Sequence, residues 1–395
     1  MKILFLAPRF PYPPYKGDQV RAYHHLRLLS QRHRVTLLSF DDAAPHTDAT
    51  DIIQSFCERV VTVPFKTISM VGWFLRGVAS GYPFQTALFQ SRAMKNAVQT
   101  LLAQHEFDVI HVQLARMAPY FEANPRTPRV IDLVDALSVN MQRRHQQERG
   151  PMWLATWLEW RNMQRYERFI CQQFERATVV SSSDRSAIGN FENLHINANG
   201  VDLDKFLFAD QTQREPNSLV FSGNMRYFPN VNGVCWFIQH VFPRIKHHLP
   251  NMRFYIVGTD PHPQVLQLAR HDPHIIVTGH VDSVAAHLSR ASIAVMPMQA
   301  GSGMQFKVIE AMACGTPAVA TPFGIGGVDV QHGQHLLIAD TPDDFAMQVQ
   351  RLLTDVHLRT HLATQGRHLV ETHYTWDRSI EALEAVYEMA IRDRA

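Results

Sequence analysis

The chain has 395 residues, which exceeds one ordinary hydrophobic core and suits two domains of normal size. Charged residues make up 19% and hydrophobic residues 46%, which is typical of a globular protein and excludes a disordered one. The formal net charge of +2 gives no electrostatic reason to expect binding to nucleic acid.

The positions of the cysteines and histidines limit the metal sites and disulfides that the chain could form. The four cysteines, Cys57, Cys171, Cys235 and Cys314, are widely separated, which argues against a zinc ribbon or a disulfide framework and agrees with a reducing cytosol. The 22 histidines show no metal-ligand spacing, so we expect no bound metal. No stretch approaches the roughly 18 consecutive apolar residues of a membrane-spanning helix. We therefore expect a cytoplasmic protein.

The first 40 residues predict a strand, a loop, a helix and a second strand. The apolar run 1–8 and the run 35–40 are the strands, and Asp18 is the expected cap of the helix between them. This order is typical of a parallel βαβ unit, whose ligands lie at the carboxyl ends of the strands. The proline-rich loop that ends with Gly17 is therefore expected to face a cleft, although it would also fit an ordinary connection.

A third strand is predicted at 60–64, and residues 68–90 are unusually apolar for a segment of helix and loop. Core packing is the favoured explanation for this segment. The alternative is contact with a membrane or with a lipid-linked acceptor, which keeps a peripheral position on the inner face of the plasma membrane open.

Two further strands, 107–113 and 130–135, are expected to run towards the same edge of the sheet. His111 and Gln113 lie two residues apart, so their side chains point to the same side. Asp135 ends the next strand, where it would either meet an acceptor hydroxyl or cap the following helix. We favour the cap.

Residues 151–177 predict a long helix in which Trp153, Trp157 and Trp160 share one face. Packing of this face on the sheet is the favoured interpretation, and a helix on a membrane surface is the alternative. The last strand of the first domain and the cap of the next helix are expected at 178–184.

The second domain is predicted to repeat the alternation of strands and helices. Strands at 219–223, 254–258 and 275–279 each end in glycine. The polar linker before them follows Asp202 and Asp204, whose spacing resembles a metal-binding pair but is better explained as a turn.

A glycine turn that leads into a short helix forms the most informative stretch, 298–317. Gly301 and Gly303 allow a sharp turn and close approach of a ligand, while Ser302 and Gln305 fit a capping box. Since Gly315 and Pro317 stop helices, we expect the helix from about 303 to 314.

The start of such a helix offers free backbone N–H groups and a partial positive charge, which suits a diphosphate. Lys307 and Glu310 are three residues apart and share one helix face. The lysine would reach phosphate oxygens, and the carboxylate would accept hydrogen bonds from sugar or ribose hydroxyls. A capped helix with a surface Lys–Glu pair would give the same pattern.

The stretch resembles the signature of retaining glycosyltransferases of family 4, which have the GT-B fold. Glu310 falls on the second glutamate of that signature, and the residues from Ala311 to Pro317 match it closely, whereas Ser302 stands at the first glutamate position. A version with Gly-x-Gly-x-x-x-Lys-x-x-Glu-Ala-Met-Ala belongs to a branch in exopolysaccharide synthesis, and the chain is more similar to that branch.

The resemblance implies roles for individual residues. Asn224 stands where many family members have arginine, and Arg226 is the nearest candidate for that work. Gln113 replaces the second histidine of the family's His-x-His, so a catalytic histidine is not expected there. The implied catalytic residues are Glu310, Lys307 and Arg226; the donor-binding residues are Gly17, Gly223, Asn224, His280, Val281, Gly301, Ser302, Gly303 and Met304; the acceptor-side residues are His111, Gln113 and Asp135.

The family's architecture implies two doubly wound Rossmann-like domains facing across a cleft. The first is expected at 1–200, a linker at 201–217, the nucleotide-sugar domain at 218–374 and a helix returning to the first domain at 375–395. The implied activity is sugar transfer from a nucleotide-diphosphate donor to a glycan or lipid-linked acceptor, with retention and without a metal or other cofactor. A sugar-nucleotide epimerase and a non-catalytic binding module are the alternatives.

Overall fold

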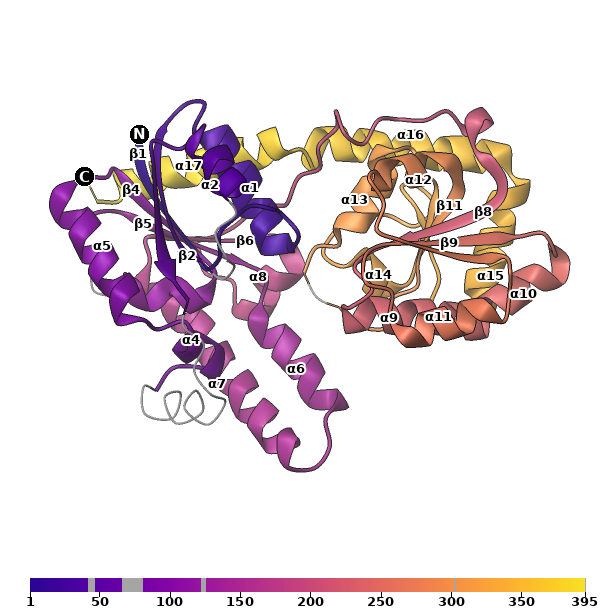
Figure 1. Ribbon diagram of the computed structural model, residues 1–395, viewed down its shortest axis with the longest axis horizontal. Coiled ribbons are helices and arrows are strands. Elements are labelled where there is room, and N and C mark those ends of the chain that lie inside the picture. Colours follow the sequence, from indigo (N-terminus) through magenta and orange to yellow (C-terminus); the bar gives the residue numbers. More distant parts are fainter. Residues whose placement is uncertain (42–46, 66–80, 122–125, 302, 395) are drawn as a thin grey trace. The chain divides into compact units, whose positions relative to one another are not determined.

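The computed structural model describes residues 1–41, 47–65, 81–121, 126–301 and 303–394 (Figure 1). The chain divides into two compact units, Met1–Ala198 with Ser379–Ala395, and Asn199–Arg378.

The first unit is built on a seven-stranded parallel sheet in the order β3-β2-β1-β4-β5-β6-β7. Its strands are β1 (Lys2–Ala7), β2 (Arg34–Asp41), β3 (Arg59–Pro64), β4 (Val109–Gln113), β5 (Arg129–Val134), β6 (Arg176–Val179) and β7 (Leu194–Ile196). Its helices are α1 (Gly17–Leu29), α2 (Thr47–Gln54), α4 (Phe84–Leu88), α5 (Arg92–Gln104), α6 (Leu137–Gln147), α7 (Pro151–Gln173), α8 (Ser182–Ile188) and α17 (Trp376–Arg392).

Helices cover both faces of this sheet, which explains why β1 is apolar from Ile3 to Ala7. Ile3 and Phe5 belong to the core beneath α1, α2 and α17, whereas Leu4 and Leu6 belong to the core beneath α5 and α7. The expected cap of α1 is wrong, because the helix already begins at Gly17 and Asp18 lies in its first turn.

The second unit is built on a six-stranded parallel sheet in the order β10-β9-β8-β11-β12-β13. Its strands are β8 (Glu215–Ser222), β9 (Arg253–Val257), β10 (Ile275–Gly279), β11 (Ala291–Met296), β12 (Ala318–Ala320) and β13 (Leu337–Ile338). Its helices are α9 (Phe228–Trp236), α10 (Phe242–His248), α11 (Pro263–Arg270), α12 (Val284–Arg290), α13 (Phe306–Ala313), α14 (Pro322–Ile325), α15 (Pro342–Thr354) and α16 (Val356–His373).

The predicted α/β class with two doubly wound, Rossmann-like parallel sheets is confirmed. The predicted return of the last helix to the first sheet is confirmed as well. Tyr387 of α17 is fully buried, and its hydroxyl lies 2.9 Å from Nδ1 of His111 on β4. In the described ranges, no helix combines the length and apolar character needed to cross a membrane.

The predicted packing of the tryptophan face of α7 is wrong. Met163 and Ile170, in the second half of the helix, are fully buried in the core of the first unit. Trp153 and Trp157 are instead 48% and 37% exposed, because the first half of α7 lies against α6 rather than on the sheet. Most of the apolar segment predicted at 68–90 lies outside the described residues.

Candidate functional site

Three glycines bring backbone segments together at the carboxyl ends of β8, β9 and β10. Gly223 N donates to Val257 O at 2.9 Å, and Gly258 N donates to Gly279 O at 3.2 Å. A Cβ added to Gly258 would lie 1.8 Å from Gly223 O, so only glycine fits there. This edge of a parallel sheet is where ligands of doubly wound folds bind.

The turn between β11 and α13 reaches the same edge of the sheet. Gly303 has a φ of +64°, and Met304 forms an antiparallel bridge with Gly326. Because Met304 is extended against Gly326, the helix cannot begin at 303. The expected start and capping box are therefore wrong: α13 begins at Phe306 with Gln305 as N-cap, and Ser302 lies outside the described residues.

Lys307, in the first turn of α13, is buried with neutral partners. Its Nζ donates to Asn230 Oδ1 at 2.8 Å and to Gln305 Oε1 at 3.4 Å, and lies 5.1 Å from the centroid of the Phe221 ring. Burial lowers the pKa of Lys307 to about 8 although Glu310 opposes the shift. Among the described residues, no carboxylate lies within ion-pair distance of this ammonium, so an anionic ligand would supply the missing counter-charge.

Glu310, one turn further along α13, is partly buried. Burial raises its pKa to about 7, while Lys205 and Lys307 oppose the shift. Its side chain accepts no hydrogen bond in the part of the chain that the structure describes, so a ligand hydroxyl could donate to it. A carboxyl group with this pKa changes charge near neutral pH.

Asn230 joins the turn after β8 to Lys307 and was not among the residues predicted for the site. Its Nδ2 donates to Asn224 O at 2.9 Å and occupies the space where a Cβ on Gly223 would come within 2.7 Å. The sequence offered one signal for it, a polar residue in the first turn of the helix that follows the glycine. Asn230 therefore positions the lysine against the glycine turn.

The other residues predicted for the donor lie around this edge. Arg226 is mostly exposed and pairs with Asp260, with 3.2 Å between Nη2 and Oδ1. Its backbone N donates to Asn224 Oδ1 at 2.8 Å. His280 and Val281 follow β10 directly, and His280 is exposed. The structure therefore leaves the Arg226 guanidinium exposed and paired with Asp260.

The residues predicted for the acceptor side, together with Gly17, lie in the first unit. His111 is fully buried in mid-strand, with its ring stacked on Phe5 at 4.2 Å between centroids. Gln113 is also buried and donates to Asp18 O at 2.9 Å. Gly17 is exposed at the start of α1. Burial leaves neither His111 nor Gln113 an open surface to offer an acceptor.

Asp135 lies at the carboxyl end of β5. The favoured capping role is wrong, because α6 has Ala136 as its N-cap and no side-chain cap. Asp135 instead accepts from Asn140 Nδ2 at 3.0 Å. Burial and the neighbouring Asp184 raise its pKa to about 6. Asp135 thus has the chemistry to accept a proton from a hydroxyl near neutral pH.

His25, His111 and Asp132 form a group of possible metal ligands in the described part of the chain. Asp132 is already paired with Arg21, whose Nε donates to Asp132 Oδ2 at 2.6 Å and whose Nη2 donates to Oδ1 at 3.2 Å. Both side chains are fully buried. A guanidinium at this carboxylate opposes a second cation, so the arrangement is better explained as a buried structural ion pair. Asp202 accepts from the backbone of Asp204 at 3.0 Å, which confirms the predicted turn.

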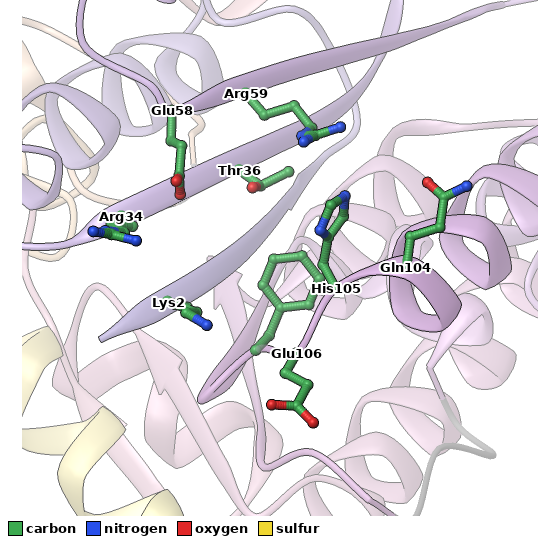
Figure 2. A pocket seen from close by; sticks show the side chains of 9 residues that line it. Lys2, Arg34, Thr36, Glu58, Arg59, Gln104, His105 and Glu106 are labelled. Atoms are coloured by element: carbon green, nitrogen blue, oxygen red, sulfur yellow. The ribbon is translucent and has the colours of Figure 1, made fainter.

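A pocket of about 260 Å³ opens at the opposite edge of the first sheet, where Lys2, Arg34 and Arg59 begin β1, β2 and β3 (Figure 2). Figure 2 shows Glu58 and Glu106 among these cations. Since ligands of doubly wound sheets bind at the carboxyl ends of strands, this pocket is not the candidate site.

Part of the second unit is similar in sequence to glycosyltransferases. Residues 216–355 match the model of the family described as glycosyl transferases group 1. A D-inositol 3-phosphate glycosyltransferase from Streptomyces bingchenggensis is 34% identical over 113 residues, which are 28% of this chain and 24% of that protein. The chain thus spans about a quarter of the length of this curated relative.

Solved structures extend the likeness in fold to both units. Sucrose-phosphate synthase from Thermosynechococcus elongatus has a TM-score of 0.74 at 16% identity, with all of both chains covered. HepE from Anabaena in complex with UDP has a TM-score of 0.68 at 14% identity and covers 98% of this chain and 100% of its own. The two parallel-sheet units therefore have the architecture of GT-B glycosyltransferases.

Proposed function

We propose that the chain transfers a sugar from a nucleoside-diphosphate donor to a glycan or lipid-linked acceptor in the synthesis of a cell-surface polysaccharide. The observation that carries this proposal is the buried ammonium of Lys307 beside a glycine turn, whose hydrogen-bond acceptors among the described residues are all neutral: Asn230 Oδ1, Gln305 Oε1 and Met298 Sδ. A diphosphate satisfies such a cation, and HepE, which shares the fold, is described as a complex with UDP.

In the proposed reaction, the bond between the sugar's anomeric carbon and the diphosphate oxygen breaks, and a bond from that carbon to an acceptor hydroxyl oxygen forms. The acceptor hydroxyl gives its proton to the Asp135 carboxylate in this proposal, and the nucleoside diphosphate leaves with an added negative charge. Lys307 and the backbone N–H groups at the start of α13 stabilise that charge. Arg226 would add to this stabilisation after leaving Asp260.

Glu310 is the proposed acceptor of hydrogen bonds from donor hydroxyls, because its carboxylate has a raised pKa and no hydrogen-bond donor among the described residues. Gly223, Asn224, Gly301, Gly303 and Met304 would place backbone close to the donor. The remaining proposed donor contacts are Gly17, His280, Val281 and Ser302.

Asp135 is the proposed contact of the acceptor hydroxyl, because its pKa is raised to about 6 at the carboxyl end of β5. The burial of His111 and Gln113 makes them supports of that edge in this proposal. Retention of anomeric configuration, independence of metal ions and a place in the exopolysaccharide branch are parts of the same proposal, and they rest on the resemblance of residues 301–317.

Turnover with defined donors tests this function. The chain is incubated with UDP- and GDP-sugars, with and without a polyprenyl-diphosphate sugar acceptor, in the presence of EDTA. We expect donor-dependent glycosylation of the acceptor and release of nucleoside diphosphate. Conversion of the donor sugar into an epimer, or tight donor binding with no turnover on any acceptor, would refute transfer in favour of an epimerase or a binding module.

A further inference from the structure

The hairpin of α6 and α7 extends away from the first sheet of its own unit (Figure 1). Glu167 of α7 accepts from Ser138 N at 3.1 Å near the base of the hairpin. Near its end, His145 Nδ1 lies 3.1 Å from Trp153 O, and the His145 ring stacks against Trp160. These contacts hold the two helices together as one projecting element.

The first two turns of α7 form an apolar tip, which we define as Met152, Trp153, Leu154, Trp157 and Leu158. Each of these side chains is more than a third exposed, and Leu154 reaches 54%. Large apolar side chains are usually scattered singly over a soluble surface, so a cluster that includes two tryptophans marks an interaction site.

The charges of α7 are divided between its two sides. Its glutamates point inward: Glu159 accepts from Phe84 N at 2.7 Å and from Gln85 N at 3.0 Å, and Glu167 is bound to α6. The exposed charged side chains of the helix are all arginines, Arg161, Arg165 and Arg168. The solvent side of α7 therefore carries positive charge only.

The loop before α7 adds little negative charge to this side. Glu148, its one acid, is paired with Arg144 through Nε and Oε1 at 3.4 Å, while Arg149 is exposed. At 100° per residue, the apolar tip from Trp153 onward and the arginines at 161 and 165 share the face opposite Glu159. The apolar tip from Trp153 onward and the arginines at 161 and 165 thus form one continuous amphipathic surface.

We propose that the apolar tip and the arginines at 161 and 165 dock this chain on an anionic lipid surface. Tryptophan suits the boundary between lipid and water because its ring is apolar and its indole N–H remains able to donate. Leucine side chains enter the acyl boundary, and arginines behind them meet anionic headgroups, which is the composition of a helix that lies on a membrane.

The purpose of membrane docking rests on the proposed function, because an enzyme bound to a membrane would meet a lipid-linked acceptor there. The docking surface itself needs neither nucleotide nor acceptor. Vesicle binding can therefore fail while sugar transfer to a detergent-solubilised acceptor succeeds, or the reverse, and the two failures remain distinguishable.

Vesicle flotation tests the docking surface with the full chain. The probes are vesicles of phosphatidylcholine alone and of phosphatidylcholine mixed with phosphatidylglycerol. We expect binding to the anionic vesicles, weakened by salt. The double variant Leu154→Ser, Trp157→Ser and the double variant Arg161→Gln, Arg165→Gln should each bind about tenfold or more weakly. Met347→Ser, which removes a comparably exposed side chain from α15, should bind as the wild type.

The variants must keep wild-type thermal unfolding and UDP binding, so that lost flotation reports the surface and not the fold. Arg161 and Arg165 are exposed, so we expect the arginine variant to fold as the wild type does. It therefore tests the surface even if the serine variant fails to fold. The proposal is overturned if the wild type ignores anionic vesicles or if both double variants float as well as the wild type. It is also overturned if the serine variant converts a dimer into a monomer without any vesicle binding, which would assign the apolar tip to a second copy.

Discussion

The substitution Lys307→Met removes the ammonium from the candidate site and keeps most of the apolar stem. In the structure this ammonium donates to Asn230 and Gln305 and has no ion pair among the described residues. A charge-assisted hydrogen bond to a diphosphate contributes about 1.5–3 kcal/mol, which corresponds to roughly 10- to 150-fold in affinity. We expect UDP to bind this much more weakly to the variant, and sugar transfer to fall below detection for both Lys307→Met and Lys307→Ala.

Isothermal titration with UDP measures the effect directly. Lys246→Met is the matched control, because Lys246 lies in the same unit and pairs with Asp272 away from the candidate site. Loss of Lys307 should not lower the melting temperature, since the variant no longer buries an unpaired charge. Equal affinities for UDP in wild type and Lys307→Met would refute the assignment of the diphosphate to this edge.

The pH dependence of UDP binding gives the same reasoning a second test. Burial lowers the pKa of Lys307 to about 8, so the free protein loses this positive charge as the pH rises above that value. Binding of a diphosphate then requires uptake of a proton, and affinity should fall about tenfold per pH unit above pH 8. The slope should vanish in Lys307→Met. A slope that persists in the variant would assign the titration to another group.

Three further substitutions test other parts of the structure. Burial raises the pKa of Glu310 to about 7, so between about pH 4.5 and 7 the folded state holds a proton that the unfolded state has lost. The melting temperature should therefore fall as the pH rises through this range. Glu310→Gln should flatten this melting-temperature profile and abolish transfer. Gly223→Ala places a Cβ 2.7 Å from Asn230 Nδ2 and should weaken UDP binding. Gly333→Ala is the control for backbone strain, because Gly333 also has a positive φ, +79°, but an added Cβ there meets no atom within 4 Å; equal binding by both variants would contradict the role of Asn230. Asp132→Ala removes the carboxylate that pairs with the fully buried Arg21 and should destabilise the first unit by about 3–5 kcal/mol in thermal unfolding, more than Asp132→Asn.

The fold could be predicted from the sequence because each sheet is buried on both faces. Strands such as β1 and β11 then contain apolar runs, Ile3–Ala7 and Ile293–Met296, and Gly223, Gly258 and Gly279 mark the carboxyl ends of β8, β9 and β10. The short strand β7 was missed because its three residues, Leu194–Ile196, carry too little apolar pattern to stand out.

The start of α13 was misplaced for a reason outside its own sequence. A capping box can be recognised locally, but Met304 is held extended by a bridge to Gly326, which follows it by 22 positions. The exposure of Trp153 and Trp157 was missed for a similar reason. Their spacing predicts an apolar helix face, but only the path of α6 decides that this face meets solvent and not the sheet.

The spacing of Lys307 and Glu310 predicts that they share a helix face. The sequence could not predict how deeply the fold buries the two groups. Burial disfavours the charged form of both groups: it lowers the pKa of the lysine and raises that of the glutamate. Each group therefore gains most from a ligand that restores its charge, a phosphate for the ammonium and a hydroxyl donor for the carboxylate. A nucleoside-diphosphate sugar carries phosphate and hydroxyl groups in one molecule, with hydroxyls on both the donor sugar and the ribose. A free nucleoside diphosphate has only the ribose hydroxyls. In the proposed function, binding of the nucleoside-diphosphate sugar would therefore offset both pKa shifts.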